Sequence, residues 1–157
     1  VAMADQDFYV RYYVGRRGKM GFDFLEFEFQ QSGKMRYVNS TRYKGENKIQ
    51  KTAWVSAAIL EQVKDMVVSS KVIDLDDAKW PEPTPDAKQE LEVVLGDVHI
   101  SFSTLPIGSS LEIRGTEDPK GLQDFHNLVQ DLRCLVLPLI SVHFKINPLG
   151  NQSAKFE

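Results

Sequence analysis

The sequence contains a single cysteine and no long apolar stretch. Cys134 has no partner within the 157 residues, so no internal disulfide is possible, and we expect a reducing, intracellular compartment. No apolar run approaches the roughly 18 to 20 residues that span a bilayer. The opening residues, VAMADQD, lack the apolar segment of a signal peptide. We therefore expect neither secretion nor a membrane span.

Positive charge is also scarce. Lysine and arginine together number 19 and aspartate and glutamate 22, which gives a formal net charge of −3 at pH 7. Proteins that hold nucleic acid mainly through phosphate contacts carry a clear basic surplus, so the charge balance argues against such a protein. The three histidines and the lone cysteine are scattered, without the ligand spacing of a zinc site. We expect no metal and no cofactor.

Alternating apolar and polar residues predict β-strands early in the chain. The segment 7–14, DFYVRYYV, and the segment 21–29, GFDFLEFEF, each place apolar side chains on one face. Two further strands are predicted over KMRYVN and NKIQKTAWV. A second hairpin is predicted over 89–104, with its turn at Gly96-Asp97. The clean alternation indicates an antiparallel sheet with one face in water.

Two carboxylates on the predicted wet face, Glu26 and Glu28, admit two interpretations. Paired carboxylates serve as general acid and base in some enzymes. However, Arg11 and Arg36 on neighbouring strands can oppose them, and cross-strand ion pairs then explain the carboxylates without catalysis. We predict the ion pairs.

No arrangement of nucleophile and base predicts an enzyme. His126 and Cys134 fall on one predicted helix, about 80° apart on a helical wheel, so they do not meet. No other grouping of polar residues converges on one place. We therefore expect a protein without catalytic activity.

The segment GRRGKMGF, residues 15–22, combines three glycines with three basic residues. It lacks the Lys-Ser/Thr ending and the following helix of a P-loop. Its likeness to the aromatic RNA-binding motif of RRM strands fails because its residues are out of register. We predict a hairpin loop whose basic tip, Arg16, Arg17 and Lys19, is available to an acidic partner surface or to an RNA backbone.

Two long helices are predicted in the remaining sequence. Ser56 can cap the first of them. Asp118 is a good N-cap for the last helix, and Pro119 suits its first position. The last helix carries two adjacent apolar rows. Phe125, Val129, Val136 and Ile140 form one row, and Leu128, Leu132, Leu135, Leu139 and Val142 form the other.

A helix that packs on a sheet through one face buries one apolar row and would leave the second row exposed to water. Each fully buried aliphatic side chain contributes about 1.5–3 kcal/mol. Five such residues left in water therefore indicate a binding surface for another polypeptide. The alternative is a helix buried on both sides within this domain. Periodicity alone leaves both interpretations open.

Four stretches of the chain make it similar to a known family. They are DFYVRYYVGRRGKMGFDFLEFEF, GKMRYVN, QELEVVLGDVHISF and the segment from DPKGL through LVQDLRCLVLPLISVHFKINP. These long, ordered signatures closely resemble the Mago nashi family. The resemblance implies an α+β fold: a six-stranded antiparallel sheet with two main helices packed on one side and a short extra helical turn. The resemblance implies a single domain over residues 7–148. A flexible N-terminal extension, 1–6, is expected before it, and a flexible C-terminal tail, 149–157, after it.

The resemblance also implies a function. Mago nashi proteins are core subunits of the exon junction complex, which marks spliced mRNA and influences its export, localisation, translation and nonsense-mediated decay. In the family, a helical surface binds the sheet face of an RRM protein, and Leu139 matches a family position in that contact. We assign the second apolar row to this interface: Leu128, Leu132, Leu135, Leu139 and Val142.

Other partners follow from the same resemblance. The heterodimer is expected to lock a DEAD-box helicase on RNA, and Lys19 and Lys44 match family positions in the helicase contact. RNA is then met only through the complex. The family also interacts with a disassembly factor, PYM. The expected location is the nucleus, with shuttling to the cytoplasm.

The last helix departs from this pattern at Pro138. Pro138 stands where the family has a small polar residue, and it is expected to kink or loosen the last helix because it removes a backbone donor. The basic loop and an aromatic strand face, Tyr9, Tyr13 and Phe24, would also suit a direct RNA-binding protein. That alternative predicts a strongly salt-dependent affinity of the isolated chain for RNA.

Overall fold

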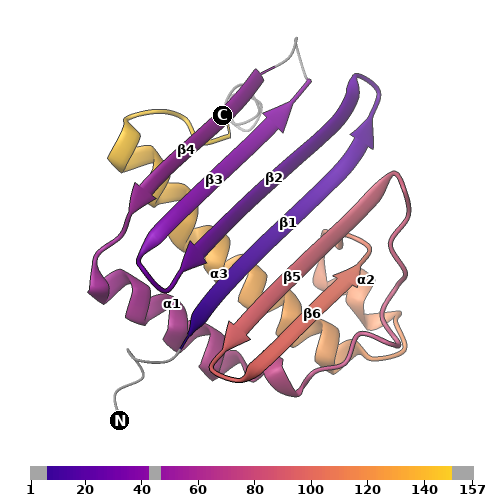
Figure 1. Ribbon diagram of the computed structural model, residues 1–157. Helices are drawn as coiled ribbons and strands as arrows, with labels where there is room; N and C mark the ends of the chain where they lie inside the picture. Colours follow the sequence, from indigo (N-terminus) through magenta and orange to yellow (C-terminus); the bar gives the residue numbers. More distant parts are fainter. Residues whose placement is uncertain (1–6, 43–46, 150–157) are drawn as a thin grey trace.

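The protein is built from one antiparallel sheet with helices packed on one of its faces. The computed structural model describes residues 7–42 and 47–149. Six strands lie in the order β4-β3-β2-β1-β5-β6, and α1 and α3 cross the same face of the sheet (Figure 1). This arrangement confirms the predicted α+β fold. The predicted extension, 1–6, and all of the predicted tail except Leu149 lie outside the described residues; Leu149 itself packs against the core.

The elements follow one another in a simple order. The strands are β1 (Phe8–Gly18), β2 (Gly21–Gln30), β3 (Lys34–Thr41), β4 (Asn47–Trp54), β5 (Ala87–Leu95) and β6 (Val98–Thr104). The helices are α1 (Ala57–Ser70), the short 3-10 helix η2 (Val72–Asp74), α2 (Ser110–Arg114) and α3 (Pro119–Phe144). The first four strands form a meander, and β5 returns to pair with β1, with Phe8 opposite Leu95.

The core lies between the sheet and the two long helices. Along β1 and β2, alternate apolar side chains are buried, as the period of two predicts. Phe27 and Phe29 are 1% and 0% exposed, and Val136 and Ile140 of α3 are fully buried opposite the sheet. Trp80, from the connector before β5, packs against Phe125 with the two rings tilted and their centroids 5.0 Å apart, so the connector also joins the core.

The predicted loop at residues 15–22 is shorter than expected. Strand β1 continues to Gly18, and the turn consists of Lys19 and Met20 alone. The prediction of a longer loop is wrong because Gly15 and Arg16 are paired on both sides, with β2 and with β5. Two neighbouring strands thus satisfy backbone groups that the glycines would otherwise leave free.

Both long helices begin where their caps predict. The Ser56 hydroxyl accepts from the backbone N–H of Ile59, and the Asp118 carboxylate accepts from that of Gly121. Helix α3 then runs through Pro138 to Phe144. Pro138 has no backbone N–H, so one carbonyl in the preceding turn lacks its helical donor. Pro138 is exposed and lies in the last turns, where water can donate to that carbonyl instead.

A buried lysine on α1 leads to a first prediction. Lys64 is 1% exposed, and within the described residues its ammonium has no hydrogen-bond partner. Glu61 Oε1 lies 3.5 Å away and the centre of the Phe8 ring 5.6 Å away. Burying a charge with so few partners costs more than these contacts return, so Lys64→Met is expected to raise the free energy of unfolding by about 1 kcal/mol. Urea unfolding measures this; a loss of stability would show that the ammonium is well stabilised.

Alkaline pH is expected to destabilise the core through two tyrosines. The Tyr12 hydroxyl donates to Gln89 Oε1 at 2.8 Å, and the Tyr37 hydroxyl donates to the Pro148 carbonyl at 2.6 Å. Burial raises the pKa of Tyr37 to about 12 and also raises the pKa of Tyr12. In the unfolded chain these hydroxyls ionise near pH 10. Above about pH 10 the unfolded state therefore binds fewer protons than the folded state, and the free energy of unfolding falls as pH rises.

Urea unfolding between about pH 8 and pH 11 measures this slope. In Tyr37→Phe the slope should be smaller, although the lost hydrogen bond lowers stability at every pH. A free energy of unfolding that stays constant over this range would contradict the prediction.

Candidate protein-interaction surface

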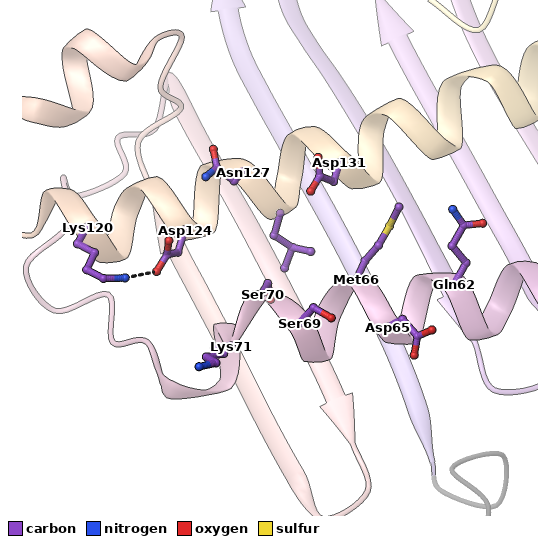
Figure 2. A pocket seen from close by; sticks show the side chains of 11 residues that line it. Gln62, Asp65, Met66, Ser69, Ser70, Lys71, Lys120, Asp124, Asn127 and Asp131 are labelled. Carbon is purple, nitrogen blue, oxygen red and sulfur yellow. Dashed lines mark hydrogen bonds and ion pairs between the residues drawn. The ribbon is translucent and has the colours of Figure 1, made fainter.

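A groove runs between α1 and α3 on the side of the helices that faces away from the sheet. Its volume is about 630 Å³. Figure 2 shows the side chains that line it, which come from residues 62–71, in α1 and its C-cap, and from the N-terminal half of α3. Met66 and Leu128 supply its apolar part. The other lining residues are polar: Gln62, Asp65, Ser69, Ser70, Lys71, Lys120, Asp124, Asn127 and Asp131.

The groove is open to water, and several of its polar side chains are engaged locally: the Ser70 hydroxyl donates to the Val67 carbonyl, and Asn127 Oδ1 accepts from the Gln123 amide. The Lys120 ammonium lies 3.1 Å from Asp124 Oδ2, and this is the one ion pair between the side chains drawn in Figure 2. Asp65 and Asp131 are exposed on opposite walls. Such a surface of apolar floor and polar rim is typical of a protein interface rather than of a buried seam.

The structure corrects part of the predicted second apolar row. Leu128 and Leu132 are 2% and 0% exposed, so the prediction that they lie in water is wrong. Both belong to the core cluster, and α1 packs alongside α3 near Leu128. The interpretation of a helix buried on both sides therefore holds for this half of α3.

The C-terminal half of α3 retains an uncovered apolar strip. Leu135 and Leu139 are half-buried against the core, and Val142 is 77% exposed. Pro138 is exposed on the same part of the helix. We call Leu135, Leu139 and Val142 the α3 strip. It continues the line of the groove along α3, and its role in partner binding stays a prediction.

The basic tip of the β1–β2 hairpin is only partly free. Arg17 Nε donates to Asp86 Oδ1 at 2.8 Å, and the Arg17 guanidinium also lies 5.8 Å from the centre of the Phe22 ring. The Arg17 side chain stays exposed in this surface ion pair, so the availability of the basic tip to a partner stays a prediction. Arg16 and Lys19 are exposed. Lys44, the second predicted helicase contact, lies outside the described residues.

The face of the sheet opposite the helices carries the predicted cross-strand ion pairs. Glu26 accepts from both neighbours: Arg11 at 2.7 Å and Arg36 at 2.8 Å. Arg36 also pairs with Glu28 at 3.0 Å, and Glu28 accepts a hydrogen bond from the Tyr9 hydroxyl. Burial and this carboxylate raise the pKa of Tyr9 well above its ordinary value. The carboxylates thus serve structure, as predicted.

This same face does not suit RNA. The Tyr13 and Phe24 rings stack on each other at 5.8 Å, which uses part of the surface that a base would need. Arg11 and Arg36 of this face are already paired with Glu26 and Glu28, so their positive charges are not free to bind phosphates. The geometry therefore counts against the alternative of direct RNA binding.

Within residues 7–42 and 47–149, no three side chains of His, Cys, Asp or Glu gather in a way that could hold a metal ion. None of the described helices combines the length and the apolar character needed to cross a membrane.

Comparison with known proteins agrees with the architecture. The family model described as Mago nashi protein matches residues 8–149. A protein of Arabidopsis thaliana named "Protein mago nashi homolog" is 51% identical over 143 residues, which cover 91% of this chain and 95% of the relative. The chain belongs to the Mago nashi family.

Proposed function

We propose that this protein is a non-catalytic core subunit of the exon junction complex. It forms a heterodimer with an RRM protein through the helical surface made of the α1–α3 groove and the α3 strip. The observation that carries this proposal is the α3 strip itself: Val142 is 77% exposed beside half-buried Leu135 and Leu139. An apolar strip next to an open, polar-rimmed groove fits a protein partner, and an RRM sheet offers the flat apolar face that would cover it.

The heterodimer helps to hold a DEAD-box helicase on spliced mRNA. Lys19, at the exposed tip of the β1–β2 hairpin, and Lys44 supply the helicase contact. In this role the protein supports mRNA export, localisation and nonsense-mediated decay, and the disassembly factor PYM is a further partner. It works in the nucleus and shuttles to the cytoplasm, and it meets RNA through the complex.

Reconstitution with an RRM protein of this complex tests the proposal. The purified chain should elute with that protein as a one-to-one heterodimer in size-exclusion chromatography. The chain alone should not bind an RNA oligonucleotide, whereas the heterodimer should prolong the residence of the helicase on RNA in the presence of ATP. Salt-dependent RNA binding by the isolated chain, without heterodimer formation, would contradict the proposal and favour a direct RNA-binding protein.

A further inference from the structure

A second cavity lies between the sheet and α3, away from the α1–α3 groove. Its volume is about 300 Å³. Its floor is a row across three neighbouring strands, Val14 of β1, Leu25 of β2 and Asn39 of β3, which the strand register places side by side. Arg133 of α3 and Leu149 close the cavity from the helix side. The cavity therefore joins one sheet and two later parts of the chain.

Two guanidinium groups line this cavity without a partner. Arg16, on β1, is exposed, and Arg133, on α3, is half-buried. Neither forms a hydrogen bond or an ion pair with another residue of the described chain. A guanidinium offers five donors in a planar fork, and a half-buried one without an acceptor has lost part of its hydration. The two guanidinium groups therefore favour the binding of a negatively charged ligand in this cavity.

The single carboxylate in the lining does not meet that need. Asp23 stands opposite Arg16 in the strand register, but the two form no ion pair. Instead, Asp23 Oδ1 accepts the backbone N–H of Arg42 at 2.7 Å. Burial raises the pKa of Tyr37, and the Asn39 side chain and then the charge of Arg133 partly offset that rise. Two cations therefore face one carboxylate that is already engaged.

We propose that this cavity binds the carboxylate side chain of an extended acidic segment from a partner protein. Guanidinium forks bind carboxylates in a bidentate manner, which favours an Asp or Glu side chain over a neutral one. The apolar floor of Val14 and Leu25, together with Leu149, would pack against the methylene groups of a glutamate. A cavity of this size is at the small end of ligand sites and suits one side chain.

A protein segment is favoured over nucleic acid. RNA carries a phosphate at every nucleotide, but this chain has a formal net charge of −3 and the lining itself includes Asp23. Flanking phosphates would be repelled, whereas a single carboxylate needs only the two guanidinium groups. The site lies outside the α1–α3 groove and the α3 strip, so it does not depend on the proposed heterodimer.

A short fluorescein-labelled peptide in which glutamate alternates with leucine is a suitable probe. Fluorescence polarisation would compare the wild-type chain with Arg133→Gln and Arg16→Gln. Each variant should bind the peptide roughly tenfold more weakly, as expected for the loss of a charge-assisted hydrogen bond. Arg114→Gln is the matched control, because Arg114 is exposed on α2 and does not line the cavity. Its affinity should equal that of the wild type.

Methyl NMR of the wild-type chain keeps the test decisive if a variant fails to fold. The methyl signals of Val14, Leu25 and Leu149 should shift on adding the peptide and should stay still with a glutamine-for-glutamate peptide. Shifts that map elsewhere, no binding, or equal affinity for Arg133→Gln would overturn the proposal. Displacement of the peptide by an oligouridine RNA would also overturn it, in favour of a phosphate site. Binding of an RRM protein should be unchanged in Arg133→Gln, which separates this result from the proposed heterodimer.

Discussion

Leu139→Arg is expected to weaken binding of the RRM partner by roughly a hundredfold or more, while the chain stays folded. Leu139 is half-buried at the edge of the core, in the middle of the α3 strip. A guanidinium there can reach water in the free protein, so the fold tolerates it. In the heterodimer the same charge would be buried against an apolar sheet face without a partner, which is costly. Co-purification and calorimetric titration measure the loss.

Two control variants separate interface from fold. Leu111→Arg changes the same residue type at a site on α2 that is 75% exposed, and it should bind the partner normally. Val142→Arg lies at the exposed end of the α3 strip and should weaken binding without any loss of stability. Circular dichroism would establish that each variant is folded. If Leu139→Arg unfolds the chain, or if it leaves heterodimer formation intact, the α3 strip is not the interface.

Leu132→Ala is expected to have a large effect of another kind. Leu132 is fully buried in the core, so truncation removes core contacts and leaves a cavity. The expected loss is about 2–5 kcal/mol in the free energy of unfolding, which is a substantial part of the stability of a domain this size. Urea denaturation measures it.

Partner binding provides the discriminating readout for Leu132→Ala. Below its unfolding transition the variant should still form the heterodimer, because the α3 strip is intact. Leu111→Ala, at an exposed site, should change the free energy of unfolding by less than about 0.5 kcal/mol. If Leu132→Ala has normal stability but fails to bind the partner, the prediction is contradicted and Leu132 belongs to the interface rather than to the core.

Most of the fold could be predicted from local sequence patterns. Strand alternation, the Ser56 and Asp118 caps and the Gly96-Asp97 turn each depend on residues within a few positions of one another, and all three appear in the structure. The cross-strand partners of Glu26 were also predictable, because adjacent antiparallel strands fix which residues oppose each other.

The candidate site could be predicted less completely. A helical wheel describes α3 in isolation and shows two apolar rows, but it cannot show that α1 covers only one end of the second row. Leu128 and Leu132 therefore looked like Leu139 in the sequence, although their surroundings differ. The signal that could have separated them was the apolar stripe of α1, which ends long before it could cover the whole length of α3.

The other features that the sequence did not predict depend on contacts between residues far apart in the chain. The ion pair of Arg17 joins residues 69 positions apart, and no local motif predicts Asp86 as its partner. The cavity lined by Arg16 and Arg133 could not be predicted for the same reason. Arg16, Asn39 and Arg133 are far apart in the sequence and come together only because α3 crosses the strands that carry the other two.

The pairing of β1 with β5 has a consequence for the order in which the protein forms. Phe8 pairs with Leu95, so the middle of the sheet is completed by contacts of long sequence separation. Such contacts slow folding because a long loop must close before they form. During synthesis the first four strands leave the ribosome well before β5, and β1 remains an open edge rich in apolar side chains until then. The nascent chain thus passes through an interval in which it is prone to aggregate, and it leaves that interval only when Leu95 becomes available.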